Sequence, residues 1–182
     1  IRDRVLCSLM SQVRSDYKII THRVLRQAPA IRDMILPIDF DETEAALATN
    51  LETRIAATQH LKNDGAVIIF PAGTISLAPK LLGDAYDIEW KSFAAKLATH
   101  RDTVTVPFLF DGCNSVLFQA ARRLSQTLGY SLMFREICKL MGTTVSLTMR
   151  KPIDSEDLRK IGNRKEVAKH LRDITYNFPR HQ

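Results

Sequence analysis

Apolar residues recur at helical spacing in the first third of the chain. Residues 1–15 place five of them on one helical face, namely Val5, Leu6, Leu9, Met10 and Val13. A second helix is expected over 41–65, with an inward stripe made of Leu47, Leu51, Ile55, Thr58 and Leu61. Asp41 followed by Glu44 resembles a capping box at its start, and Asn63-Asp64-Gly65 is expected to end it.

Short β-prone runs lie between the helical segments. Residues 17–21 and 35–38 predict two strands, and Pro37 suits an edge position or a strand end for the second because proline cannot donate to a ladder. Residues 66–70 are continuously apolar, which is typical of a strand buried on both faces. Two more strands are expected over 103–110 and 143–150, and four more helices over 90–100, 114–124, 130–141 and 163–178. The alternation predicts an α/β layered domain with a central, mostly parallel or mixed sheet flanked by helices.

Length and composition agree with one globular domain over 1–182, with a C-terminal helical tail over 154–182. The chain is 45% hydrophobic and 25% charged, and it contains no apolar run of the roughly 18–20 residues that span a bilayer. The sequence opens on Ile1 and Arg2 without a signal-peptide pattern, so we expect it to be cut from a longer protein.

The net charge of +6 suits an anionic partner, although a modest basic excess without a partner remains open. Nucleic acid is the weakest choice because no RNA- or DNA-binding signature accompanies the charge. The three cysteines include no CxxC pair, so the sequence predicts neither a disulfide framework nor a metal site. Each cysteine is expected to be a small buried side chain in a reducing, cytoplasmic compartment.

One segment carries recognisable binding chemistry: Phe70-Pro71-Ala72-Gly73-Thr74-Ile75-Ser76, directly after the buried strand at 66–70. Ligands of open α/β sheets bind at the carboxyl ends of strands. Gly73 lets a ligand approach the backbone closely, and the hydroxyls of Thr74 and Ser76 suit phosphate oxygens. The residues alone also fit an ordinary turn after a strand.

This segment resembles the Phe-Pro-Glu-Gly-Thr-Arg-Ser block of the glycerolipid acyltransferase family, which includes lysophosphatidate acyltransferases. It is closer still to the Phe-Pro-Ala-Gly variant of the hemolysin-like and ornithine-lipid acyltransferase branch. Further blocks follow in the family's order, namely 87–91 with 93–94, 106–108, 114–118, 134–136 and 150–153. The resemblance covers roughly residues 1–153. It implies substrate binding by seven residues: Pro71, Gly73, Thr74, Ser76, Lys91, Asn114 and Arg135.

Two departures from the family pattern change what the resemblance implies. Ala72 and Ile75 replace a Glu and an Arg that, by family analogy, bind the acceptor's phosphate. An acceptor without a glycerol-3-phosphate group, such as a lyso-ornithine lipid, therefore fits better. The family's catalytic His-x4-Asp motif is also missing, since no histidine of the chain has Asp five positions later.

In the family, that histidine is the general base that deprotonates the acceptor hydroxyl, and the aspartate orients it. The resemblance places the pair just upstream of the helix at 1–15, so we expect both residues to precede Ile1. A degenerate protein is the other interpretation. His22 follows a predicted strand and is a candidate substitute base, but the sequence favours a polar residue at a strand end.

A basic, apolar pair of helices is expected over 114–141. Arg122, Arg123, Arg135 and Lys139 flank its apolar residues, a pattern that suits an anionic membrane surface, an acyl-chain groove or simple packing on the sheet. Arg135 is expected either to pair with an acid such as Glu136 or to hold an anionic headgroup.

The resemblance thus implies an O-acyltransferase that moves a fatty acyl group from acyl carrier protein or coenzyme A to a lipid hydroxyl. The acceptor would be a lyso-ornithine lipid or a lysophospholipid, at the inner face of the membrane. No cofactor is implied beyond the acyl thioester. A non-catalytic lipid- or carrier-binding module on the same fold is the competing hypothesis, and with the catalytic pair absent these residues alone are expected to be inactive.

Overall fold

The computed structural model describes residues 2–27, 29–41, 43–74, 76, 86–110, 115–125, 131–132, 135–136, 138–139 and 142–177. Its first half contains α1 (Arg2–Val13), β1 (Tyr17–His22), two short 3₁₀ helices (Arg23–Gln27 and Pro29–Met34), β2 (Ile35–Ile38), α2 (Glu44–Lys62) and β3 (Ala66–Ile69). Its second half contains α3 (Ser92–Ala98), β4 (Val104–Thr105), β5 (Phe108–Phe110), α4 (Val116–Leu124), β6 (Leu147–Met149), β7 (Ile153–Asp154), α6 (Ser155–Ile161) and α7 (Arg164–Tyr176). The α/β class predicted from the sequence is confirmed.

Three parallel strands form the central sheet in the order β2-β1-β3. Ile19 pairs with Ile35 on one side and with Ile68 on the other, so the register aligns the carboxyl ends of all three strands. β2 is an edge strand, which is one of the two positions that Pro37 suits. Two antiparallel pairs, β4 with β7 and β5 with β6, complete the strands of the described residues.

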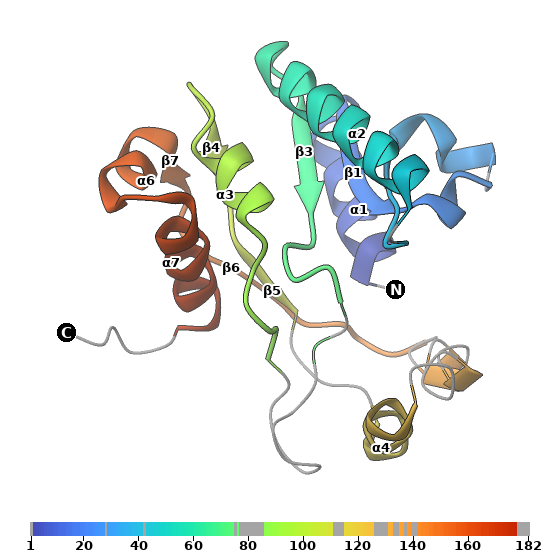
Figure 1. Ribbon diagram of the computed structural model, residues 1–182. Helices are drawn as coiled ribbons and strands as arrows, with labels where there is room; N and C mark the ends of the chain where they lie inside the picture. The colour runs from blue at the N-terminus through green and yellow to red at the C-terminus, as the bar shows by residue number, and fades with distance from the viewer. Residues whose placement is uncertain are drawn as a thin grey trace.

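The two faces of the sheet are covered by different elements, as Figure 1 shows. On one face, Tyr17, Ile19 and Ile68 join Leu6 of α1 in a cluster that also contacts β5. On the other face, Ile20 packs with Ala57 of α2 and Leu97 of α3. Because side chains of a strand alternate between faces, β1 contributes to both layers of the core.

A third cluster joins α3 to the C-terminal helices. Ala95 and Ala98 of α3 pack against Leu158 of α6 and Val167 and Leu171 of α7. The N-cap predicted at Asn163 is confirmed, since its side chain accepts from the backbone N–H groups of Lys165 and Glu166. α7 therefore shares the core with α3, and this contact matters for the loop described below.

The inward stripe predicted for α2 is wrong for Leu47, Leu51 and Ile55, whereas Leu61 does pack against the core. Leu47, Leu51 and Ile55 are 69%, 58% and 63% exposed, whereas the buried positions of α2 are Ala46, Thr53 and Ala57. Small side chains let the helix lie close to the sheet, where leucine would overpack.

Polar contacts fix the same rotation of α2. The hydroxyl of Thr53 donates to the carbonyl of Pro37 at 2.5 Å, and Asn50 exchanges two hydrogen bonds with the backbone of Asp39 at 2.8 and 2.9 Å. The capping box expected from Asp41 is also wrong. The N-cap is Thr43, whose hydroxyl accepts from the N–H of Ala46.

Some strand and cysteine predictions also need correction. The strand expected over 103–110 is divided into β4 and β5 around Pro107, and of the strand expected over 143–150 only Leu147–Met149 forms. Proline lacks the N–H needed to continue a ladder, which accounts for the first break. The two 3₁₀ helices were not predicted, whereas α6 falls within the helical tail expected over 154–182. Cys138 is exposed, contrary to expectation.

The helices expected over 114–124 and 130–141 have different outcomes. α4 confirms the first, and Ser115 caps it by accepting from the N–H of Phe118 at 3.2 Å. In the second, residues 131–132, 135–136 and 138–139 are helical, and the remaining positions lie outside the described residues.

Candidate functional site

The carboxyl ends of the three parallel strands meet at one edge of the sheet. β1 ends at His22, β2 is followed by Asp39 and Phe40, and β3 leads into the loop that begins at Phe70. This edge is where open parallel sheets bind ligands. The loop that begins at Phe70 therefore lies beside the segments that follow β1 and β2, and neither segment is part of the motif.

Gly73 ends a tight turn in this loop. Its N–H donates to the carbonyl of Phe70 at 3.2 Å, and its φ of 66° lies in the left-handed region that favours glycine. A Cβ added there would lie 3.5 Å from the ring of Phe40, an ordinary contact. Glycine is thus required by backbone conformation rather than by lack of space. The ring of Phe40 in turn stacks on His22, with centroids 5.7 Å apart.

Pro71 and Lys91 are brought together although they are far apart in sequence. The N–H of Lys91 donates to the carbonyl of Pro71 at 3.0 Å. Lys91 is the N-cap residue of α3 and its side chain is exposed. The backbone of Lys91 is thus held next to the loop, and its exposed side chain is open to a ligand.

Ser76 is tied to the second half of the site through Asp87. Its hydroxyl donates to Oδ1 of Asp87 at 2.5 Å, and Nε1 of Trp90 donates to Oδ2 at 2.8 Å. Both carboxylate oxygens of Asp87 are therefore hydrogen-bonded within the protein. The carboxylate of Asp87 therefore joins Ser76 to Trp90.

The backbone of Asp87 is held by α7. Its N–H donates to the hydroxyl of Tyr176 at 3.0 Å, and its carbonyl accepts from Nε and Nη2 of Arg172 at 3.0 and 2.7 Å. Burial, and then the charge of Asp87, raises the pKa of Tyr176 above its ordinary value. Tyr176 therefore remains a neutral phenol, and the C-terminal helix fixes the position of the loop.

A second cluster of charges lies after β1 and β2. Nε of Arg23 is 2.8 Å from Oδ2 of Asp39, whose side chain is 9% exposed, and Nη2 of Arg23 is 3.6 Å from Asp41. A pocket of about 250 Å³ is lined here by His22, Arg23, Val24 and Gln27. Because Asp39 and Asp41 compensate its charge, Arg23 is a positioned donor rather than an unpaired cation.

The hydrogen bonding of His22 sets its tautomer. Nδ1 accepts the backbone N–H of Val24 at 3.2 Å, so the neutral ring carries its proton on Nε2. In this arrangement the Nε2–H of His22 is a hydrogen-bond donor at the pocket that His22 lines. The geometry agrees with the interpretation of His22 as a polar residue at a strand end.

Two other histidines contact main-chain carbonyls. Nε2 of His60 lies 2.8 Å from the carbonyl of Asp16, and Nδ1 of His100 lies 3.1 Å from that of Arg101. His170 is on α7, and His181 lies outside the described residues. None of His22, His60 and His100 is oriented by a carboxylate in the way a general base requires.

Arg135 is exposed, and no carboxylate among the described residues lies within 4 Å of it. Its neighbour Glu136 instead accepts from the N–H and hydroxyl of Ser115 at 2.7 and 2.6 Å. Burial opposes ionisation of Glu136, but the bonds from Ser115 and the charges of Lys139 and Arg135 outweigh it, so its pKa is lowered. Asn114 and Ile75 lie outside the described residues.

The structure thus brings Pro71, Gly73, Thr74, Ser76 and Lys91 into one region, and among the described residues no hydrogen bond or ion pair joins Arg135 to them. Sequence reasoning missed Phe40, Asp39, Arg172 and Tyr176. The segment 87–91 is part of the family resemblance, but the resemblance does not predict the hydrogen bonds of Asp87. Arg172 and Tyr176 have no local signal, because their partner is more than 80 residues away.

Neither a metal cluster nor a membrane span is found in the part of the chain that the structure describes. No group of three His, Cys, Asp or Glu side chains is placed there to hold a metal ion. No helix there is long and apolar enough to cross a bilayer.

Comparison with known proteins gives one informative similarity. The chain is 32% identical over 124 residues to a lyso-glycine lipid O-acyltransferase from Phocaeicola vulgatus. It is similar to a lipid O-acyltransferase. The match covers 64% of this chain and 43% of that protein, so the chain spans less than half of this relative. No protein-family model and no solved structure matches the chain.

The similarity supports a relationship to an acyltransferase family. It agrees with the resemblance seen in the ordered sequence blocks. The hemolysin-like branch that those blocks suggest stays a prediction.

Proposed function

We propose that the chain takes part in transferring a fatty acyl group from an acyl thioester to the hydroxyl of a lipid. The observation that carries this proposal is the position of the loop from Phe70 to Ser76, at the carboxyl edge of a parallel sheet. The similarity to a lipid O-acyltransferase supports the same reaction class. The activated thioester supplies the acyl group, so the reaction needs no separate cofactor.

In the proposed reaction the acceptor oxygen attacks the thioester carbonyl carbon. A C–O bond forms, the C–S bond breaks, and the hydroxyl proton ends on the departing thiol. The Nε2–H of His22 is a donor at this edge of the sheet. Donors aimed at a developing oxyanion stabilise such a transition state. Lys91 is placed to attract an anionic group on either substrate.

The acceptor proposed is a lysolipid without a simple glycerol phosphate. Ala72 is 4% exposed, so its methyl group faces the protein and offers no contact to a headgroup. A polar side chain at this position, which the family uses for phosphate, is absent here. A lyso-ornithine lipid, a lyso-glycine lipid or a lysophospholipid fits, and the donor is acyl-acyl carrier protein or acyl-coenzyme A.

A second candidate function is a non-catalytic lipid- or carrier-binding module. The observation that favours it is that Ala72 and Ile75 replace a Glu and an Arg that, by family analogy, bind the acceptor's phosphate. Under this alternative the loop still binds substrate, but no acyl group is transferred.

Release of free thiol separates the two candidates. The protein is mixed with acyl-acyl carrier protein or acyl-coenzyme A, with and without detergent-dispersed lysolipid, and thiol and acylated lipid are quantified. Thiol release that requires the acceptor supports the enzyme. Binding of lysolipid without thiol release supports the module, and absence of both binding and release contradicts both proposals.

A further inference from the structure

The outer face of α2 carries a row of exposed aliphatic side chains. Leu47, Leu51 and Ile55 are spaced four residues apart, so they lie one above another on the helix. Their exposed fractions are 69%, 58% and 63%, and the opposite side of the helix is the one packed on the sheet. A contiguous apolar row that the fold leaves in solvent marks an interaction surface.

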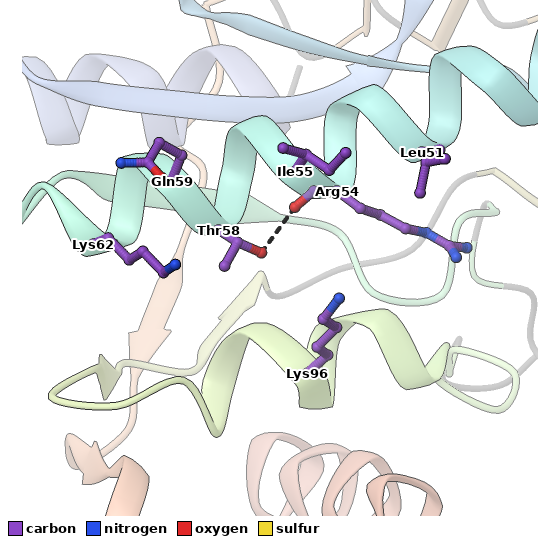
Figure 2. A pocket seen from close by; sticks show the side chains of 7 residues that line it. All are labelled: Leu51, Arg54, Ile55, Thr58, Gln59, Lys62 and Lys96. Atoms are coloured by element: carbon purple, nitrogen blue, oxygen red, sulfur yellow. Dashed lines mark hydrogen bonds between the residues drawn. The ribbon is translucent and has the colours of Figure 1, made fainter.

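Positive charges lie beside this row. A shallow groove between α2 and α3 is lined by Leu51, Ile55 and five polar residues, namely Arg54, Thr58, Gln59, Lys62 and Lys96. Figure 2 shows Lys96 rising from α3 toward α2 across this groove. Among the described residues no carboxylate lies within 4 Å of Lys62 or Lys96. These two ammonium groups are therefore available to an external anion.

Two further polar side chains of the groove, Thr58 and Arg54, have contacts within the protein. The hydroxyl of Thr58 donates to the carbonyl of Arg54 at 2.8 Å, drawn as the dashed line in Figure 2. The guanidinium of Arg54 lies 5.5 Å from the ring centroid of Phe93. The exposed acids of α2 are Glu44, which lies in the first helical turn where the helix N-terminus favours it, and Glu52, and neither lines the groove. The groove itself therefore carries a positive charge.

We propose that this face of α2, with Lys96 of α3, is the surface by which the protein lies on an anionic lipid bilayer. The inference rests on the proposed function, because lipid substrates are reached from a bilayer. Leu47, Leu51 and Ile55 enter the boundary between headgroups and acyl chains, and Lys62 and Lys96 contact lipid phosphates.

The composition of the row favours lipid over an acidic protein. Protein interfaces concentrate their energy in aromatic and arginine anchors, whereas this row is entirely aliphatic and flanked by lysines. The position of α2 agrees with this choice. The helix begins four residues after Phe40, which is 56% exposed beside Gly73, so bilayer contact along α2 brings lipid to the carboxyl edge of the sheet.

Sedimentation with vesicles tests the proposal. The probes are phosphatidylcholine vesicles with and without phosphatidylglycerol. The double variant Leu51→Asp/Ile55→Asp is expected to lose binding to both. The variant Lys62→Gln/Lys96→Gln is expected to weaken binding to phosphatidylglycerol vesicles by roughly 10- to 30-fold, and this difference should vanish at high salt. All four positions are solvent-facing, so folding should survive, as circular dichroism will confirm.

Two matched controls locate the surface. Val13→Asp changes a residue that is 79% exposed on α1, at the other face of the sheet, and should bind vesicles like the wild type. Leu124→Asp changes a residue that is 82% exposed on α4, the other basic apolar segment. Loss of binding in Leu124→Asp with normal binding in the α2 variants would overturn the proposal.

Wild-type protein that binds neither kind of vesicle would also overturn the proposal. This includes the case in which the face of α2 binds acyl carrier protein, so that Leu51→Asp/Ile55→Asp abolishes that binding. Thiol release is measured in parallel on detergent-dispersed lysolipid, where no bilayer is needed. If the α2 variants release thiol normally and bind vesicles like the wild type, only the proposed bilayer surface is contradicted. If vesicle binding depends on α2 but the protein neither binds lysolipid nor releases thiol, only the proposed function is contradicted.

Discussion

Ser76 and Asp87 are joined by a hydrogen bond of 2.5 Å, and the second oxygen of the same carboxylate accepts from Trp90 at 2.8 Å. The motif loop is therefore attached to the segment that precedes α3. Because the backbone of Asp87 is held by Arg172 and Tyr176, the attachment extends to the C-terminal helix.

The substitution Asp87→Ala is expected to lower the free energy of unfolding by about 1–3 kcal/mol, since it leaves the hydroxyl of Ser76 and the indole N–H of Trp90 without their acceptor. Chemical denaturation measures this change. Glu89→Ala is the control, because its ion pair with Lys165 joins side chains that are 71% and 81% exposed, and it should cost less than about 0.5 kcal/mol. Equal effects of the two variants would refute the structural role of Asp87.

Tyr176 should make stability decrease in alkaline solution. Its pKa is raised in the folded state, chiefly by burial, so the unfolded chain loses the phenol proton first. The stabilisation is fully present below the unfolded pKa of about 10 and is lost as the pH rises through the higher folded value. Denaturation curves across this range should show the loss in the wild type, and Tyr176→Phe should show a smaller pH dependence. Parallel pH dependences would contradict the assignment.

Asp16 should behave in the opposite way, in acid. Hydrogen bonding to Arg14, at 2.9 and 2.7 Å, lowers the pKa of Asp16 to about 2. The stabilisation is present above the unfolded pKa of about 3.9 and is lost as the pH falls toward the folded value. Carboxyl chemical shifts in an NMR titration measure this pKa directly. In an Arg14→Gln variant the titration should move toward the ordinary range, and an unmoved titration would be evidence against the pair.

Gly73 can be tested with two substitutions of different backbone preference. At a φ of 66° valine is strained by about 1–3 kcal/mol, whereas asparagine tolerates the left-handed region. Gly73→Val should therefore distort the loop and abolish substrate binding, and Gly73→Asn should retain most of it. Lysolipid binding is measured on variants whose folded state is verified by circular dichroism. Normal binding and turnover in a folded Gly73→Val variant would exclude this loop as the site.

The rotation of α2 gives a prediction about stability. Leu51→Ala removes an exposed side chain and should change the free energy of unfolding by less than about 0.5 kcal/mol. Ala57→Leu adds volume at a fully buried position and should cost about 1–3 kcal/mol. If Leu51→Ala were the more damaging of the two, the helix would have to face the sheet with its leucines after all.

Local signals account for the elements that the sequence predicted correctly. The apolar run at 66–70 and the β-prone run at 17–21 became β3 and β1, and Asn163 became an N-cap. Each depends on neighbouring residues, because strand propensity and capping act over a few positions. The loop after β3 was likewise located from its own residues, as a strand end followed by proline and glycine.

The face of α2 that meets the sheet was decided by tertiary structure. Periodicity identified a helix with an apolar stripe, and the stripe proved to face solvent. The rotation of α2 about its axis is fixed by hydrogen bonds that periodicity does not predict, namely those of Asn50 with Asp39 and of Thr53 with Pro37. The close approach of Ala57 to Ile20 agrees with them.

By itself, the sequence determined the α/β class, the strand–loop unit from Ala66 to Ser76 and the resemblance to lipid acyltransferases, because these are carried by short contiguous segments. Only the tertiary structure decided that Asp87, Arg172 and Tyr176 hold this loop, and that His22 and Phe40 lie beside it. The physical reason is that these contacts join residues that are distant in the sequence and are brought together by strand order and helix packing. A local sequence pattern does not predict contacts of this kind.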